Sequence, residues 1–223
     1  MKSKNFLSLH ILFTIFIIIA GLSFYSCSND EDKSKDNDKN KDSVNGTETD
    51  IKSEGVAMPL TLKNTWKLNY ETGKIDKGTF TMTAVENQTI NETEVTKIDY
   101  IGGIYGDEYW IYLKNTDDGI YFYGDNHTGK LKTPDLWLKY PCKEGDKWET
   151  SKQGGVVEWE IISMSEIVKV PAGEFTCIHA RGITKGTSNA ADHWWAINVG
   201  EVKFEVDLGT YKFIGELESY KVQ

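Results

Sequence analysis

Histidine and cysteine are the side chains with which this 223-residue chain could bind a metal or activate a nucleophile, and it has only four and three of them. After residue 57 the histidines are His127, His179 and His193, and neither His-x-x-x-His nor Cys-x-x-Cys spacing occurs. Zinc sites and zinc hydrolases depend on such spacings. The sequence therefore predicts no metal site and no cofactor.

Asp192 and His193 could in principle act as an orienting carboxylate and a base. Adjacent residues of a strand point to opposite faces, however, and rarely serve as a pair. No Gly-x-Ser-x-Gly nucleophile motif occurs either. We therefore expect a protein that is not an enzyme, with a hydrolase as the alternative.

The chain is rich in aromatic residues, with seven Trp, eleven Tyr and nine Phe. Rings exposed on a curved sheet would form a platform for a glycan, an apolar ligand or a protein partner. The alternative is that a small curved sheet fills its interior with large rings. We expect any single ring to be core, but not all of the six that lie on segments with two apolar faces: Trp110, Tyr112, Tyr121, Tyr123, Trp194 and Trp195.

Cys142 and Cys177 are the two cysteines of the C-terminal region. Two thiols in an oxidising compartment often form a disulfide, which requires Cα atoms within about 7 Å of each other. The pattern places Cys142 in a turn and Cys177 inside a strand, and free buried cysteine is also common. The sequence is compatible with a disulfide and with two free thiols, and we expect free thiols.

The N-terminus has the features of a secretory signal, because two lysines precede an apolar run from residue 6 to 22. This run is shorter than the ~20 apolar residues of a membrane-spanning helix. It ends at Ser26-Cys27, followed at once by polar residues, which resembles the lipobox of bacterial lipoproteins. The resemblance implies that residues 1–26 are a lipoprotein signal peptide and that Cys27 is acylated. Two or three acyl chains anchor a protein stably, so Cys27 is the expected membrane contact.

Residues 28–56 contain no aromatic and almost no apolar side chains. Such a segment cannot offset its ordering entropy by burial, so residues 27–57 are predicted to be the lipidated cysteine and a disordered acidic and polar tether. Residues 28–32 resemble the export signal of Bacteroidetes-type lipoproteins, although an ordinary linker would look the same. The expected location is the cell envelope, anchored in the outer membrane, and facing the exterior if the acidic run is a signal.

The formal net charge is −9, from 25 Lys and Arg against 34 Asp and Glu. An acidic chain without a basic stripe is unsuited to nucleic acid, whose phosphates require Lys and Arg. No basic amphipathic helix that could lie on a membrane surface is present either.

Residues 58–223 have the pattern of a single all-β domain. Val202, Phe204 and Val206 alternate with charged residues, as in a half-buried strand, and Pro171-Ala172-Gly173 predicts a turn. No window after residue 57 has a sustained apolar period of 3.6 residues. Strands are predicted over 66–70, 79–84, 94–101, 108–113, 120–123, 156–161, 175–183, 193–196, 201–206 and 211–217.

About ten short antiparallel strands usually curl or divide into two packed sheets. We therefore predict a strongly curved antiparallel meander, a half-closed or closed barrel, with a two-sheet sandwich as the alternative.

An internal duplication is indicated by segments that recur at similar offsets. Trp66 and Trp148 each follow a Pro by seven positions, at an offset of 82. Residues 108–111 match 193–196 at an offset of 85, and residues 119–123 match 200–204 at 81. The sequence therefore predicts two similar halves, residues 58–137 and 140–223, in which both tryptophans occupy equivalent inward positions.

Several motifs together resemble an uncharacterised domain of Bacteroidetes-type lipoproteins. They are Pro59-Leu60 with Asn64-Thr65-Trp66, Val-Pro-Ala-Gly-x-Phe at 170–175, and Trp-x-x-x-x-Val-Gly-x-Val-Lys at 194–203. This chain has Lys63 and Asn198 where that family usually has glycine, and Trp195 where it usually has tyrosine. The resemblance supports the predicted fold and envelope location and implies no activity.

Two classes of function fit these observations. The first is a non-catalytic binding module of a lipid-anchored envelope lipoprotein, with a glycan, an apolar ligand or a protein partner held on its aromatic face. The second is an envelope assembly protein or a lipid-carrier-like protein that shields lipid or protein segments inside a half-closed β fold. An apolar cavity enclosed by the curved sheet would be the most informative observation.

Overall fold

The computed structural model describes residues 55–73, 76–106, 108–152 and 155–223. The predicted signal peptide, Cys27 and the tether up to residue 54 lie outside the described residues. No helix within the described ranges is long and apolar enough to cross a membrane.

The described residues form twelve strands in one antiparallel sheet, which confirms the predicted all-β meander over the sandwich. A single 3₁₀ turn, η1 (Gly103–Tyr105), connects β3 to β4. The strands are β1 (Thr65–Thr72), β2 (Asp76–Ile90), β3 (Thr93–Ile101), β4 (Tyr109–Thr116), β5 (Gly119–Asp125), β6 (Gly129–Lys139), β7 (Lys147–Lys152), β8 (Gly155–Val170), β9 (Gly173–Thr184), β10 (Ala190–Ala196), β11 (Gly200–Asp207) and β12 (Lys212–Lys221).

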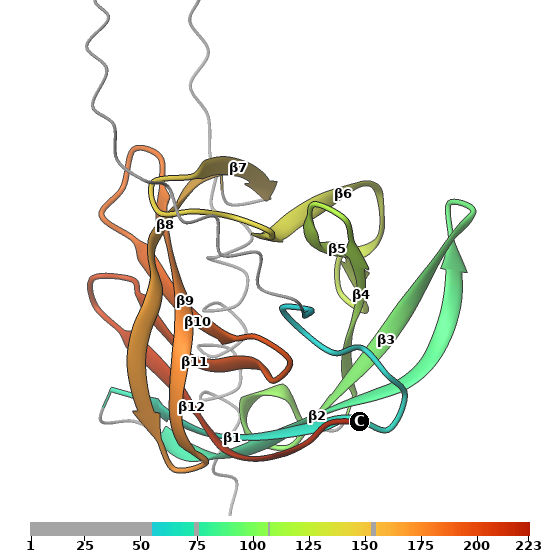
Figure 1. Cartoon of the computed structure of the whole chain (residues 1–223), viewed down its shortest axis with the longest axis horizontal. Coiled ribbons are helices and arrows are strands. Elements are labelled where there is room, and N and C mark those ends of the chain that lie inside the picture. Colours follow the sequence, from blue (N-terminus) through green and yellow to red (C-terminus); the bar gives the residue numbers. More distant parts are fainter. Residues whose placement is uncertain (1–54, 74–75, 107, 153–154) are drawn as a thin grey trace, which may run out of the picture.

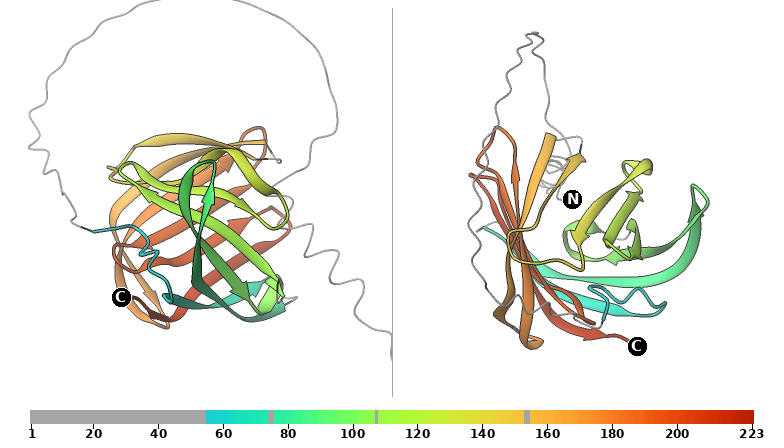
Figure 2. Two further views of the ribbon diagram at one scale, coloured as in Figure 1. Left: turned by 90° about the vertical axis from the view of Figure 1, so that its right-hand side faces the viewer. Right: turned by 45° about the horizontal axis from the view of Figure 1, so that its top comes forward.

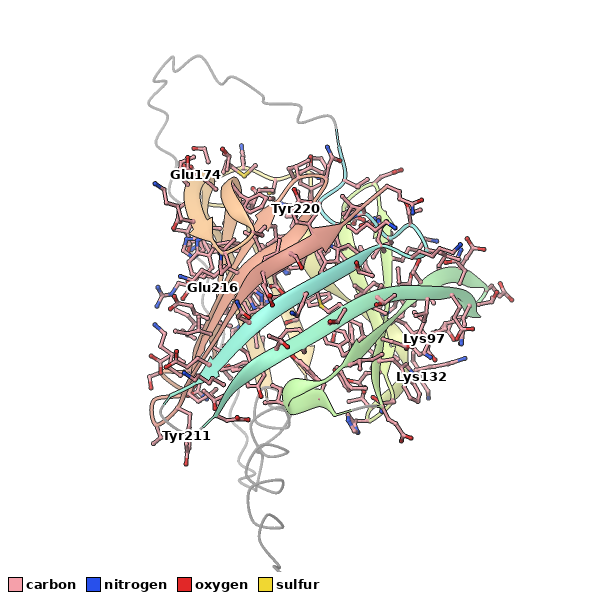
Figure 3. The ribbon with its side chains drawn as sticks, turned by 90° about the horizontal axis from the view of Figure 1, so that it is seen from below. Lys97, Lys132, Glu174, Tyr211, Glu216 and Tyr220 are labelled. Carbon is pink, nitrogen blue, oxygen red and sulfur yellow. The ribbon has the colours of Figure 1, made fainter. Side chains whose placement is uncertain are left out.

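The sheet consists of two consecutive sets of six strands, which we call the first half and the second half. Its spatial order is β6-β5-β4-β3-β2-β1-β12-β11-β10-β9-β8-β7, so β1–β6 and β7–β12 follow one another across the sheet in the same sense. Figure 1 shows the second half, in orange and red, as one wall and the first half curving round to face it. Figure 3 shows the central junction, where β12, β1 and β2 lie side by side with Glu216 and Tyr220 on β12.

The sheet curls into a nearly closed barrel (Figure 2). At one junction between the halves, β1 and β12 are paired along their length. At the other, no backbone ladder joins the described residues of the edge strands β6 and β7. They are linked there by side chains, because Trp148 Nε1 donates a hydrogen bond to the carbonyl oxygen of Leu136 (3.0 Å) and Lys139 forms an ion pair with Asp146 (3.1 Å). We call this unpaired junction the seam.

The halves correspond at a constant offset of 82 residues in their middle strands. The β4–β5 ladder has a bulge at Tyr112/Leu113, and the β10–β11 ladder has its bulge at Trp194/Trp195. The predicted match of residues 108–111 with 193–196 therefore selects the correct strands but is out of register by three residues. Because alternate residues of a strand face opposite sides, that register would place outward residues against inward ones.

Two strands were not among the predicted ranges, β6 and β7. Pro134 interrupts β6, whose pairing with β5 is irregular on either side of it. Proline cannot donate to a ladder, so it is tolerated on an edge strand such as this one. The predicted turn at Pro171-Ala172 is confirmed, since Val170 and Gly173 pair directly across it.

Residues 55–64 cover one end of the barrel. Met58 is fully buried, and its carbonyl oxygen accepts a hydrogen bond from Asn115 Nδ2 (2.7 Å). Trp66 Nε1 donates to the carbonyl oxygen of Val199 (2.5 Å) in the β10–β11 turn. We call this the closed end and the opposite one the open end.

Two residues at the closed end have positive φ angles, Lys63 (74°) and Asn198 (63°). This is the left-handed region that glycine occupies without steric cost. Lys63 and Asn198 therefore adopt a backbone conformation that glycine would adopt more readily.

Candidate ligand-binding cavity

A cavity of about 310 Å³ lies inside the barrel, towards the open end, between the two halves. Most of its lining is apolar or aromatic. Thr128 and Ser151 also line it and are solvent-exposed. The cavity therefore reaches the surface beside the turns that follow β5 and β7, next to the seam.

The first half contributes a stack of aromatic rings to the cavity wall. The centroids of Tyr100 and Tyr105 are 4.8 Å apart, and those of Tyr105 and Tyr109 are 5.1 Å apart. Phe80 meets Tyr105 edge-on at 4.9 Å. Burial raises the pKa of the Tyr100 and Tyr109 hydroxyls well above the ordinary value, so these phenols are neutral and act as amphipathic wall groups.

The second half contributes the facing wall. Trp159 and His193 meet edge-on at 5.4 Å, and Phe204 packs on Phe213 at 5.1 Å. Gly182 makes room for the Trp159 ring, because a Cβ there would lie 2.8 Å from two of its ring carbons. The interior is therefore filled from both sides by rings, and the cavity is the space left between them.

One polar pair lies within this apolar wall. His193 on β10 and Glu201 on β11 both line the cavity, and His193 Nδ1 is hydrogen-bonded to Glu201 Oε1. Only 6% of Glu201 is exposed. Buried charges require a partner, and among the described residues the imidazole is the only hydrogen-bond partner of this carboxylate.

Sequence reasoning missed Glu201 because strict alternation places it on the outer face with Lys203. The bulge in the β10–β11 ladder pairs Trp194 with Lys203 but Trp195 with Glu201, so Val202 is an additional residue. A bulge shifts the alternation by one position. Glu201 therefore points into the barrel, on the same side of the sheet as its neighbour Val202. No signal in the sequence marks the bulge.

The opposite-face argument for Asp192 and His193 is confirmed. Asp192 Oδ1 lies on the outer face, 2.8 Å from Nε2 of His179, and Glu166 Oε2 is 2.8 Å from Nδ1 of the same ring. His193 points inward to Glu201. Within the described ranges, no group of three or more His, Cys, Asp or Glu side chains could hold a metal ion.

The rim of the cavity carries two further carboxylates, Asp125 and Asp135. Asp125 Oδ1 accepts hydrogen bonds from the backbone N–H of His127 (2.8 Å) and of Thr128 (2.6 Å). Tyr109 donates its hydroxyl to Oδ2 (3.4 Å). Asp125 thus orders the β5–β6 turn in the way expected of an Asx turn.

The six predicted platform residues lie outside this cavity and do not form one surface. Trp195 is 1% exposed and packs edge-on against Trp137 (5.6 Å) in the main core. Trp194 faces outward, stacked on His179 (4.5 Å), with Lys203 Nζ 5.0 Å from its ring.

The other four, Trp110, Tyr112, Tyr121 and Tyr123, belong to a separate outer cluster. Tyr112 and Tyr123 are buried with Ile90 and Val95 of the β2–β3 hairpin. Trp110 and Tyr121 are half-buried at its edge, and Lys97 Nζ, labelled in Figure 3, lies 4.7 Å from the Trp110 ring. The hairpin therefore covers most of what the sequence suggested as a platform.

The two cysteines are free thiols in the structure, so the disulfide alternative is not formed. Cys177 is fully buried on β9. Cys142 lies in the β6–β7 connection, where its Sγ contacts Met164 Sδ at 3.5 Å. The two are held by different neighbours in the core.

Matches to known proteins were found among solved structures. No family model matches the chain, and no curated protein does. A proposed exported protein with a YmcC-like fold from Bacteroides fragilis aligns with a TM-score of 0.49 and 13% identity, over 75% of this chain and 99% of that one. A proposed lipoprotein from Parabacteroides distasonis aligns with a TM-score of 0.37 and 14% identity, over the same shares.

Proposed function

We propose that this protein is a lipid-anchored lipoprotein of the cell envelope whose barrel binds an apolar ligand in the cavity between its two halves. The observation that carries the proposal is the cavity, about 310 Å³ in volume, walled by aromatic and aliphatic side chains. Small-molecule sites are concave, mostly apolar and about 300–1,000 Å³ in volume, with a few polar groups that orient the ligand. His193 and Glu201 are such groups here.

The binding energy would come chiefly from burial of the ligand's apolar surface. Each methylene group removed from water contributes about 0.8 kcal/mol. Because the walls are rings that already pack on one another at 4.8 to 5.4 Å, the cavity needs little ordering when a ligand enters. A largely pre-formed site loses less of its binding energy to ordering.

We assign the barrel no catalytic step. Among the described residues, the only hydrogen-bonded partner of His193 is Glu201. A nucleophilic mechanism requires a hydroxyl or thiol within hydrogen-bond reach of the base. Thr150, which also lines the cavity, instead accepts a hydrogen bond from Trp159 Nε1 (3.0 Å).

The cavity can be tested with a neutral environment-sensitive dye such as N-phenyl-1-naphthylamine. Enhanced dye fluorescence, competed by an alkane-chain alcohol, is the expected result. Ala191→Phe should fill part of the cavity and weaken binding, because Ala191 lines it. Ile101→Phe is the matched control, since Ile101 is 53% exposed outside the cavity. Equal binding by both variants would show that the dye binds elsewhere.

The anchoring part of the proposal rests on residues 1–32 of the sequence. Cys27→Ala should abolish metabolic labelling with palmitate and release the chain from membranes or block its maturation. Labelling that persists in this variant would rule out acylation at Cys27. Protease treatment of whole cells then distinguishes the two faces of the outer membrane, because only a surface-exposed domain is digested.

A lipid carrier is a second candidate, favoured by the seam. Asp135 and Trp137 on β6 and Thr150 and Ser151 on β7 line the cavity from both sides of this unpaired junction. An acyl chain could leave sideways there without breaking a backbone ladder. Transfer of a fluorescent lipid between vesicles would support a carrier, whereas binding without transfer would support a receptor-like binding module.

A further inference from the structure

We propose that the cavity selects apolar ligands that carry a protonated amine, and that it discriminates against carboxylic acids. This inference rests on the proposed ligand-binding function and names its substrate class. It follows from the charges, the buried carboxylate and the rings that line the cavity.

Among the described residues, three carboxylates line the cavity and no lysine or arginine does. Asp125, Asp135 and Glu201 all contribute to the lining, and His193 is the one basic side chain among them. A fatty acid would bring its carboxylate next to that of Glu201, whose one hydrogen-bond partner among the described residues is His193. Like charges brought together in a poorly solvated site repel each other strongly, which is how sites reject the wrong ligand.

Glu201 has unused capacity to accept hydrogen bonds. Its Oε1 is bonded to His193, whereas its Oε2 has no hydrogen-bond partner among the described residues. Each carboxylate oxygen can accept about two hydrogen bonds. An alkylammonium group would donate to this carboxylate and supply a compensating charge in a place where only 6% of Glu201 is exposed.

The rings near this pair favour a cation for a second, independent reason. The faces of Trp, Tyr and Phe attract ammonium groups, and several such rings together form the usual recognition site for organic ammonium ions. His193 lies against Trp159 at 5.4 Å and Phe204 at 6.2 Å. Across the cavity, Tyr100 and Tyr105 present neutral rings, because burial raises the pKa of their hydroxyls.

The test compares decylamine, decanol and decanoate, which share a chain and differ in the charge of the head group. Each is titrated below its micelle concentration into the chain from residue 27 onward carrying Cys27→Ser, and binding is followed by calorimetry. We expect decylamine to bind at least about tenfold more tightly than decanol, a difference of about 1.4 kcal/mol, and decanoate to bind most weakly.

Variants locate the selectivity. Glu201→Gln should bring decylamine down to the affinity of decanol while leaving decanol binding in place. Glu205→Gln is the matched control on the same strand, because Glu205 pairs with Lys203 (2.9 Å) on the outer face. If Glu201→Gln does not fold, Asp135→Asn at the rim should give a smaller reduction in the same preference.

The outcomes separate the two proposals. Decanoate binding as tightly as decylamine, or an unchanged amine preference in a folded Glu201→Gln variant, would overturn the amine inference and leave the ligand-binding function standing. Binding of none of the three compounds would overturn both. Tighter binding of decylamine that depends on Glu201 supports both.

Discussion

Trp66 and Trp148 are equivalent residues of the two halves, yet the structure predicts unequal consequences when each is replaced by alanine. Trp66 is fully buried at the closed end, and its indole N–H is bonded to Val199 at 2.5 Å. Trp148 is half-buried at the seam, stacked on Trp159 at 5.9 Å and bonded to Leu136 at 3.0 Å. The equal burial expected from the sequence is therefore wrong.

The magnitudes follow from burial. Truncating a fully buried Trp to Ala costs about 3–5 kcal/mol, and the Val199 carbonyl would also lose its partner, so we expect about 5 kcal/mol for Trp66→Ala. Trp148 removes less apolar surface from water, and the Leu136 carbonyl can bond to water at the seam. We expect about 2 kcal/mol for Trp148→Ala.

Urea unfolding, followed by circular dichroism, measures both. With an m value of about 2 kcal/mol per molar urea, the midpoint should fall by about 2.5 M for Trp66→Ala and about 1 M for Trp148→Ala. If Trp66→Ala is too unstable to study, Trp66→Phe and Trp148→Phe should preserve the same order. Equal losses, or a larger loss at Trp148, would refute the account of a closed end and a weak seam.

Three further predictions follow from the packing. Burial raises the pKa of the Cys142 and Cys177 thiols to about 12, and a nearby carboxylate adds a smaller effect, that of Asp146 for Cys142 and that of Glu166 for Cys177. Both thiols should therefore react slowly with a disulfide reagent in the native chain carrying Cys27→Ser and fully on unfolding, whereas a missing thiol in unfolded, unreduced protein would show a disulfide. Burial, followed by the hydrogen bond to Asp76, raises the pKa of Tyr70 from 10.0 to about 12, so the folded state retains a proton that the unfolded chain loses. The stability that this proton contributes should be complete below about pH 10 and lost as the pH rises through about 12. Tyr70→Phe should therefore reduce the pH dependence of the urea midpoint over that range, and an unchanged dependence would contradict this prediction. A Cβ on Gly215 would lie 2.2 Å from Phe204 Cε1, so Gly215→Ala should cost about 1–3 kcal/mol by overpacking. The double variant Gly215→Ala with Phe204→Leu should lose less free energy of unfolding than the two single variants lose together. A loss equal to that sum would mean that the Phe204 ring moves away freely.

Much of the fold could be predicted because strand signals are local. Val202, Phe204 and Val206 alternate with polar residues, and the structure buries all three. The Pro171-Ala172 turn depends on backbone preferences of the turn residues themselves. The offset of 82 residues could be found because the order of the strands repeats along the sequence.

The sequence by itself thus determined the class of fold and the N-terminal features on which the anchoring proposal rests. Only the tertiary structure decided which residues face the cavity. A one-residue bulge turned Glu201 inward beside His193, and the β2–β3 hairpin covered the outer aromatic cluster. The physical reason is that side-chain direction in a sheet depends on register, and register is set by pairing with strands that lie far away in the sequence.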